Sequence, residues 1–181
     1  HINIAIAYNI WRYFQASGDE EFMASYGAEM VLEIARFWSS LATFSDERGR
    51  YEIRGVMGPD EFHDGYPNKA MPGLNNNSYT NLMAVWVMCR ALEVLDLLSD
   101  LRRAELTTQM GLSAEEIARW DDISRRMYLP FHEDGIISQF EGYDELPELD
   151  WQHYRAQYGN IQRLDLILEA ENDSANRYKL S

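Results

Sequence analysis

Apolar side chains recur at intervals of three and four residues along most of this chain, and on a helix that spacing gives one apolar face. The clearest runs predict helices over about residues 4–16, 20–41, 78–99, 113–127 and 161–171. Strands and helices do not alternate, which argues against a parallel sheet. We therefore expect an all-α fold in which antiparallel helical hairpins stack side by side.

Local signals set the ends of these helices. Gly18 ends the first helix, because glycine tolerates the left-handed geometry that follows a helix. Asp19 and Ser113 are good N-caps for the second and fourth helices. Gly27 marks a point where the second helix is interrupted. The predicted buried stripe of that helix consists of Met30, Ile34, Phe37, Trp38 and Leu41.

The stretch between the second and third helices has a different character. Residues 46–49 (Asp-Glu-Arg-Gly) have turn chemistry and residues 51–53 alternate, so we predict one short β-hairpin near 43–54. Residues 55–77 then contain four Gly, three Pro and three consecutive Asn. Loops of this length in compact domains usually carry function. We therefore predict that residues 55–77 form an active-site loop.

Charge and cysteine content exclude several classes of protein. The chain has 30 acidic residues against 16 Lys and Arg, whereas nucleic-acid binding needs a positive surface, and so does an anionic membrane. The longest apolar run, 83–89, is far too short to span a bilayer. Cys89 is the only cysteine, which rules out an intramolecular disulfide and a thiolate metal cluster. We expect a cytoplasmic protein with no nucleic-acid or membrane partner.

The densest group of reactive side chains is the run Gly-Pro-Asp-Glu-Phe-His-Asp at 58–64. An acid that protonates a glycosidic oxygen must keep its proton near neutral pH. Asp60 and Asp64 can raise the pKa of Glu61 by like-charge repulsion, and Phe62 can add desolvation. Arg54 can lower that pKa or bind a substrate hydroxyl.

Plainer interpretations of the same residues stay open. An acidic loop is most often a solvated surface, and Asp, Glu and His together can hold a divalent cation. His63 alone is more often a structural hydrogen-bonding residue than a ligand or base. The amides at 75–77 either cap the next helix or project into a site. Trp151 is either a platform for a sugar or a partly exposed packing residue.

Three runs in the first 40 residues form an ordered series: 1–8 (His-Ile-Asn-Ile-Ala-Ile-Ala-Tyr), 26–29 (Tyr-Gly-Ala-Glu) and 35–38 (Ala-Arg-Phe-Trp). They resemble successive helices of glycoside hydrolase family 65. Residues 54–63 (Arg-Gly-Val-Met-Gly-Pro-Asp-Glu-Phe-His) resemble its catalytic segment, and 76–81 (Asn-Asn-Ser-Tyr-Thr-Asn) the start of its next helix. The resemblance covers the whole chain and is strongest in its first half.

The resemblance implies both a fold and a reaction. The family includes phosphorylases of maltose, trehalose, kojibiose and nigerose, and a few hydrolases. Its catalytic domain is an (α/α)6 barrel, of which residues 1–181 would be a single partial domain. Glu61 takes the place of the general acid in an inverting phosphorolysis of an α-linked glucosyl disaccharide to β-glucose 1-phosphate. Inorganic phosphate is then the co-substrate, and neither a cofactor nor a metal is expected.

The resemblance also implies contacts and leaves alternatives. His1, Arg54, Asp60, His63 and Asn77 are the implied substrate-binding residues, and a homodimer is an assembly to test. This chain departs from the family at 75–78, where many members have Asp-Asn-Asn-Ala and it has Asn-Asn-Asn-Ser, a difference that bears on the acceptor contacts.

The family's Lys-Gln pair, which helps hold phosphate, is absent from this chain, so we expect the chain alone to be inactive. One alternative is an α-glucoside hydrolase whose base lies beyond this chain or among Asp144, Glu145 and Glu148. The other is a non-catalytic helical module that binds a sugar or a partner.

Overall fold

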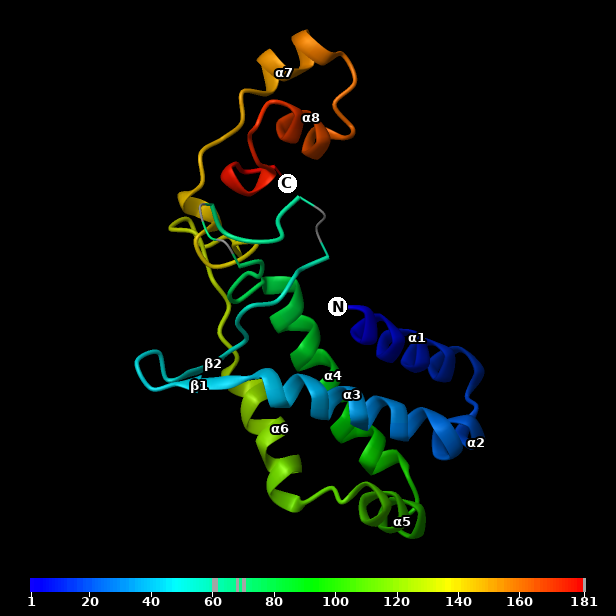
Figure 1. Cartoon of the computed structure of the whole chain (residues 1–181). Helices are drawn as coiled ribbons and strands as arrows, with labels where there is room; N and C mark the ends of the chain where they lie inside the picture. The colour runs from blue at the N-terminus through cyan, green and yellow to red at the C-terminus, as the bar shows by residue number, and fades with distance from the viewer. Residues whose placement is uncertain (60–61, 68, 70, 181) are drawn as a thin grey trace. The chain divides into compact units, whose positions relative to one another are not determined.

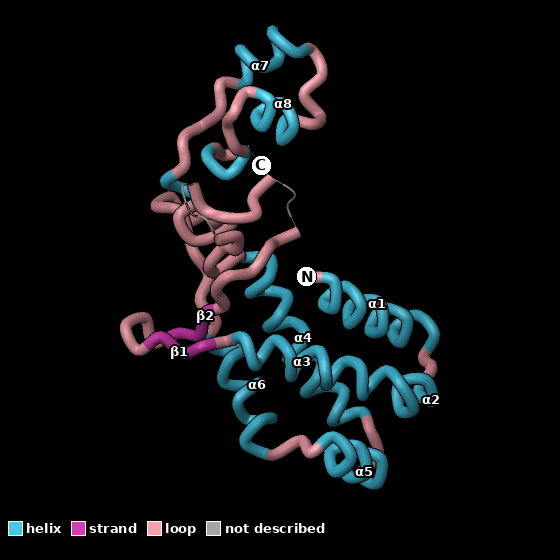
Figure 2. Tube along the Cα trace, in the orientation of Figure 1, coloured by secondary structure: helices cyan, strands magenta, loops and turns pink. Residues whose placement is uncertain are grey.

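The computed structural model describes residues 1–59, 62–67, 69 and 71–180, and they are mostly helical (Figures 1 and 2). The chain divides into two compact units. The first, here called the helical unit, comprises His1–Ile53 and Thr80–Tyr128. The second, the loop-rich unit, comprises Arg54–Tyr79 and Leu129–Ser181. The expected all-α fold with one short β-hairpin is confirmed, whereas the assignment of residues 1–181 to a single domain stays a prediction.

The helical unit contains the longest helices and the only sheet of the described residues. Helix α3 lies against both α1 and α6, and β2 lies beside α6. Strands β1 and β2 pair antiparallel, with Phe44 opposite Tyr51. The elements are α1 (Ile2–Ser17), α2 (Glu20–Phe22), a π-helical turn (Met23–Gly27), α3 (Ala28–Leu41), β1 (Thr43–Ser45), β2 (Arg50–Glu52), α4 (Ser78–Leu97, which starts in the loop-rich unit), α5 (Asp100–Met110) and α6 (Ala114–Arg126).

The capping residues act as the sequence predicts. Gly18 follows α1 with φ 65°, in the left-handed region. The side chains of Asp19 and Ser113 accept hydrogen bonds from backbone N–H groups in the first turns of α2 and α6. The interruption expected at Gly27 is the π-helical turn, where a Cβ would lie 3.0 Å from the sulfur of Met23. The absence of a side chain at Gly27 therefore lets this turn pack closely.

The predicted stripe of α3 is wrong at three of its five positions, because Met30, Phe37 and Leu41 are exposed. The spacing rule selects the largest apolar residues, but the face that packs includes alanines, whose small side chains let neighbouring helices approach closely. This buried face, at most 3% exposed, consists of Ala28, Val31, Leu32, Ala35 and Trp38.

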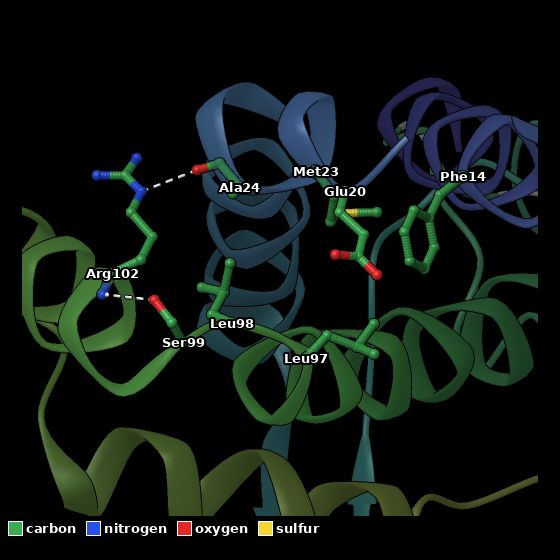
Figure 3. A pocket seen from close by; sticks show the side chains of 8 residues that line it. All are labelled: Phe14, Glu20, Met23, Ala24, Leu97, Leu98, Ser99 and Arg102. Carbon is green, nitrogen blue, oxygen red and sulfur yellow. Dashed lines mark hydrogen bonds between the residues drawn. The ribbon is translucent and has the colours of Figure 1, made fainter. Parts of the chain in front are cut away.

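The helical unit also has a pocket of about 240 Å³ (Figure 3). Arg102 donates from Nε to the carbonyl of Ala24 at 2.8 Å, and its backbone N–H donates to Oγ of Ser99 at 3.3 Å. None of the predicted site residues that the structure describes lines this pocket. Its lining consists of Phe14, Glu20, Met23, Ala24, Leu97, Leu98, Ser99 and Arg102.

The loop-rich unit is built around two small apolar clusters. The C-terminal cluster consists of Leu149, Leu164, Leu168, Ala175 and Leu180. The aromatic cluster consists of Leu74, Phe140 and Tyr143. The regular elements of this unit are a 3-10 turn (Tyr143–Glu145), α7 (Trp151–Tyr158), α8 (Leu164–Ala170) and a second 3-10 turn (Ala175–Arg177). Among all the described residues, no helix is long and apolar enough to cross a membrane.

Candidate active site

The predicted acid Glu61 and its neighbour Asp60 lie outside the described residues. The residues on both sides of them are described and belong to the loop-rich unit. We define the acid segment as residues 58–65. The contacts of its described residues, on both sides of Asp60 and Glu61, show what surrounds the predicted acid.

On the N-terminal flank, Gly58 lies directly against the side chain of Asn77. A Cβ at Gly58 would lie 2.3 Å from Nδ2 of Asn77, closer than any real side-chain contact. Asn77 is only 2% exposed and immediately precedes α4. Because only glycine fits here, the segment that leads to Glu61 is packed against the residue before the α4 N-terminus.

The two ends of the loop 55–77, on either side of the acid segment, are paired with each other. Val56 and Leu74 form an antiparallel bridge, with N–H to O distances of 3.0 and 2.7 Å. The backbone N–H of Gly55 donates to Oδ1 of Asn75 at 3.3 Å. At Gly73, φ is +111°, and a Cβ would lie 2.8 Å from the backbone carbon of Gly55. The two ends of the loop therefore lie side by side.

Two of the side-chain amides at 75–77, those of Asn76 and Asn77, are buried. Asn76 is fully buried with φ 49°, and its Nδ2 donates to Oε2 of Glu141 at 2.8 Å. The backbone N–H of Asn75 donates to the phenolic oxygen of Tyr66 at 3.1 Å. These amides therefore hold protein groups that line the loop.

On the C-terminal flank, Phe62 and His63 are seated in the two apolar clusters. Phe62 packs against the C-terminal cluster. His63 is 1% exposed, and its Nε2 donates to the carbonyl of Tyr178 at 2.9 Å. Its ring lies 5.2 Å from that of Phe140 and 5.6 Å from that of Tyr143. These contacts give His63 a structural role, and its contact with substrate stays a prediction.

The turn at Asp64 and Gly65 is bound by one distant side chain, Asn176. Its Oδ1 accepts the backbone N–H groups of Asp64 at 3.0 Å and Gly65 at 3.3 Å. Its Nδ2 donates to Oδ1 of Asp64 at 2.6 Å. The residues that follow Glu61 are thus held by the chain segment 173–180.

That segment is itself organised around the carboxylate of Asp173. Asp173 accepts from the backbone N–H of Ser174 at 2.8 Å, Nη1 of Arg177 at 2.8 Å and the hydroxyl of Tyr178 at 2.6 Å. The hydrogen bond from Tyr178 contributes most to lowering the pKa of Asp173 below its usual 3.8. The charged form of Asp173 therefore stabilises the folded segment.

The stabilisation by Asp173 should depend on pH. Because its folded pKa is lowered, the contribution is present above the unfolded pKa of 3.8 and is lost as pH falls through the folded value. Asp173→Asn should cost about 1.5–3 kcal/mol near neutral pH, the range for hydrogen bonds to a charged group. Thermal unfolding of both proteins across acidic and neutral pH measures this. A difference in melting temperature that stays constant down to the most acidic pH would contradict it.

The other predicted contact residues are distributed over both units. Arg54 is exposed in the loop-rich unit. Burial is the main cause that raises the pKa of Tyr66, and the positive charge of Arg54 acts on that pKa in the opposite direction. His1 is exposed at the N-cap of α1, in the helical unit. The structure therefore places Arg54, His63 and Asn77 in the same unit as the acid segment. Substrate binding by these residues stays a prediction.

The alternative site residues also lie in the loop-rich unit. The hydrolase candidates Asp144, Glu145 and Glu148 are exposed. Trp151 is half-buried, packs against the C-terminal cluster and lines a pocket of about 420 Å³ with Tyr143 and Lys179. Within the described part of the chain, no group of three or more His, Cys, Asp and Glu side chains could hold a metal ion.

Comparisons with known proteins agree on one family. The family model described as the glycosyl hydrolase family 65 central catalytic domain matches residues 1–181. An uncharacterized glycosyl hydrolase of Mycobacterium tuberculosis is 60% identical over 181 residues, covering 100% of this chain and 14% of that protein. The trehalose 6-phosphate phosphorylase of Lactococcus lactis is 35% identical over 181 residues, covering 100% of this chain and 22% of that protein.

The fold has a counterpart among solved structures. A chain from the human microbiome, named provisionally as a kojibiose phosphorylase, superposes with a TM-score of 0.79 at 23% identity, over 98% of this chain and 23% of that one. This likeness confirms the expected fold class, helical hairpins from an (α/α)6 barrel. The chain therefore spans less than a quarter of the length of these relatives.

Proposed function

The chain belongs to glycosyl hydrolase family 65, as part of its central catalytic domain, and we propose that the complete protein is an inverting phosphorylase of an α-linked glucosyl disaccharide. Relatives named as phosphorylases of trehalose 6-phosphate, kojibiose and maltose support phosphorolysis. The observation that carries the proposal is that described residues on both sides of Glu61 have separate fixed contacts: Gly58 packs against Asn77, and His63 and Asp64 are hydrogen-bonded to Tyr178 and Asn176.

The proposed reaction is a single displacement. Glu61 donates its proton to the bridging oxygen, the bond from the anomeric carbon to that oxygen breaks, and a phosphate oxygen attacks the same carbon from the opposite face. The products are β-glucose 1-phosphate and the acceptor sugar. An inverting glycosidase needs a second carboxylate to activate water, but phosphate already carries a nucleophilic oxygen. One protein acid is therefore enough.

The remaining site residues follow the same proposal. Arg54, Asp60 and Asn77, with His1 and His63, contact the sugar or the groups that hold it. Inorganic phosphate is the co-substrate, no cofactor is needed, and a homodimer is the assembly that we propose. The chain alone is inactive in this account, because phosphate binding needs residues outside it.

The test uses the complete protein. It is incubated with a panel of α-linked glucosyl disaccharides, with and without inorganic phosphate, and both free glucose and glucose 1-phosphate are assayed. We expect cleavage that depends on phosphate for one disaccharide, which also names the substrate. Glucose release that is indifferent to phosphate would favour the hydrolase, and no cleavage of any sugar would favour the binding module.

A further inference from the structure

Asn176 makes three hydrogen bonds to the turn at Asp64 and Gly65, which follows Glu61 in the sequence. A carboxamide offers an acceptor and a donor side by side, and the turn needs both. Its oxygen accepts two successive backbone N–H groups, of Asp64 and Gly65, while its nitrogen donates to the Asp64 carboxylate. Asp would lack the donor and Ala would lack both, so this turn is matched to an asparagine.

The platform that presents Asn176 is well fixed. The second 3-10 turn, Ala175–Arg177, begins at Ser174, whose side chain accepts the N–H of Asn176 at 3.2 Å. Ala175 is buried in the C-terminal cluster, and the Asp173 carboxylate joins both ends of the turn. The side chain of Asn176 therefore has a fixed base from which to hold the turn at Asp64.

The turn itself is held on its other side as well. The carbonyl of Asp64 accepts from the N–H of Gly73 at 2.6 Å. Both backbone groups of Asp64, three residues after Glu61, thus have fixed partners. Release of the Asn176 contact would free the amide side of this turn and leave only the carbonyl side bound.

We propose that Asn176 is a positioning residue: by holding the turn at Asp64 and Gly65, it supports the transfer of a proton from Glu61, three residues before that turn, to the bridging oxygen. The inference rests on the proposed function, since it assigns Asn176 a part in that same reaction. The contacts that carry this role are those of Asn176 with Asp64 and Gly65, so the effect on Glu61 is indirect. A displacement of about 1 Å at a catalytic group can cost about 100-fold in rate. The loss should therefore appear in the step that needs the acid.

Two substrates separate a positioning role from a structural one. The disaccharide needs a protonated leaving group, whereas α-glucosyl fluoride releases fluoride with little assistance from an acid. In the complete protein, Asn176→Ala should lower kcat for the disaccharide about 10- to 100-fold and leave KM within about threefold. Phosphorolysis of α-glucosyl fluoride should stay within about threefold of the parent. A purely structural residue would lower both rates alike.

An exchange of the two partners provides the second variant. Asn176→Asp places two carboxylates against each other and should reduce kcat for the disaccharide as Asn176→Ala does. Adding Asp64→Asn restores a donor opposite the new carboxylate, with the same total charge, and should recover at least about half of the lost log kcat. The comparison of Asn176→Asp with the double variant tests the positioning role even if Asn176→Ala fails to fold.

Asn160→Ala is the matched control. Asn160 also accepts a backbone N–H, that of Gln162, but within its own turn at 3.0 Å. The Asn160→Ala variant should keep kcat for the disaccharide and the rate with α-glucosyl fluoride within about twofold of the parent. The proposal is overturned if the exchange recovers nothing, if Asn176→Ala keeps normal kcat, or if both substrates lose rate alike. If the parent cleaves no disaccharide, the proposed function fails first; an active parent with unaffected variants defeats this inference alone.

Discussion

Glu61→Gln is expected to lower kcat for the disaccharide about 10²- to 10⁴-fold, the range that a general acid contributes. The amide has nearly the shape of the acid but has no acidic proton to give to the bridging oxygen. The fold should be kept, so the melting temperature should change little. Steady-state kinetics of the complete protein, with thermal unfolding alongside, measures both quantities.

The same variant should keep much of its activity on α-glucosyl fluoride, because fluoride leaves with little protonation. Glu133→Gln, an exposed change in the same unit, is the matched control and should have normal kinetics. Near-normal turnover of the disaccharide by Glu61→Gln would end the proposal that Glu61 is the acid.

Gly58→Ala should have the second-largest effect. Its added methyl would lie 2.3 Å from Nδ2 of Asn77, which is buried, so one of the two residues must move. Forcing one carbon into a packed site costs about 1–3 kcal/mol. Because the shift falls three residues before Glu61, kcat should fall as well, by about 10- to 100-fold. Chemical denaturation and kinetics of the complete protein measure the two losses.

Gly65→Ala is the control for that change, in the same loop. There the nearest atom to an added Cβ is 3.5 Å away, an ordinary van der Waals distance. This variant should lose less stability than Gly58→Ala, because its added methyl meets no atom closer than 3.5 Å. Equal losses in Gly58→Ala and Gly65→Ala would show that the contact with Asn77 is not what limits position 58.

Element type and element ends were predictable where the signal is local. Gly18, Asp19 and Ser113 mark helix ends through chemistry confined to one turn, and the structure has those ends. Helix α5 was missed, although Ser99 caps its start and Gly111 follows its end. Its side chains are mostly exposed, so it lacks the apolar stripe that the sequence analysis relied on.

Which face of a helix packs was not predictable from the same pattern. In α3 the buried face includes Ala28 and Ala35, which a search for large apolar residues passes over. Helix α7 was also missed: it has no fully buried residue, and the face that packs on the C-terminal cluster is made of the partly buried Trp151 and Tyr154. Burial depends on the neighbouring helices, and the sequence alone does not place them.

The acid segment could be found because its residues are consecutive, but its supports could not. Tyr178 lies 115 positions from His63, and Asn176 lies 112 from Asp64. No spacing rule joins residues so far apart. Asn176 and Tyr178 appear as partners only when the chain is folded.

The most direct test of the central claim is the configuration of the sugar phosphate at early reaction times. Proton NMR of the complete protein acting on its disaccharide in phosphate buffer resolves the anomeric proton of the sugar phosphate before this product is consumed. Displacement from the face opposite the leaving group predicts β-glucose 1-phosphate as the first product. The α-anomer as the first product, or free glucose without any sugar phosphate, would contradict the account.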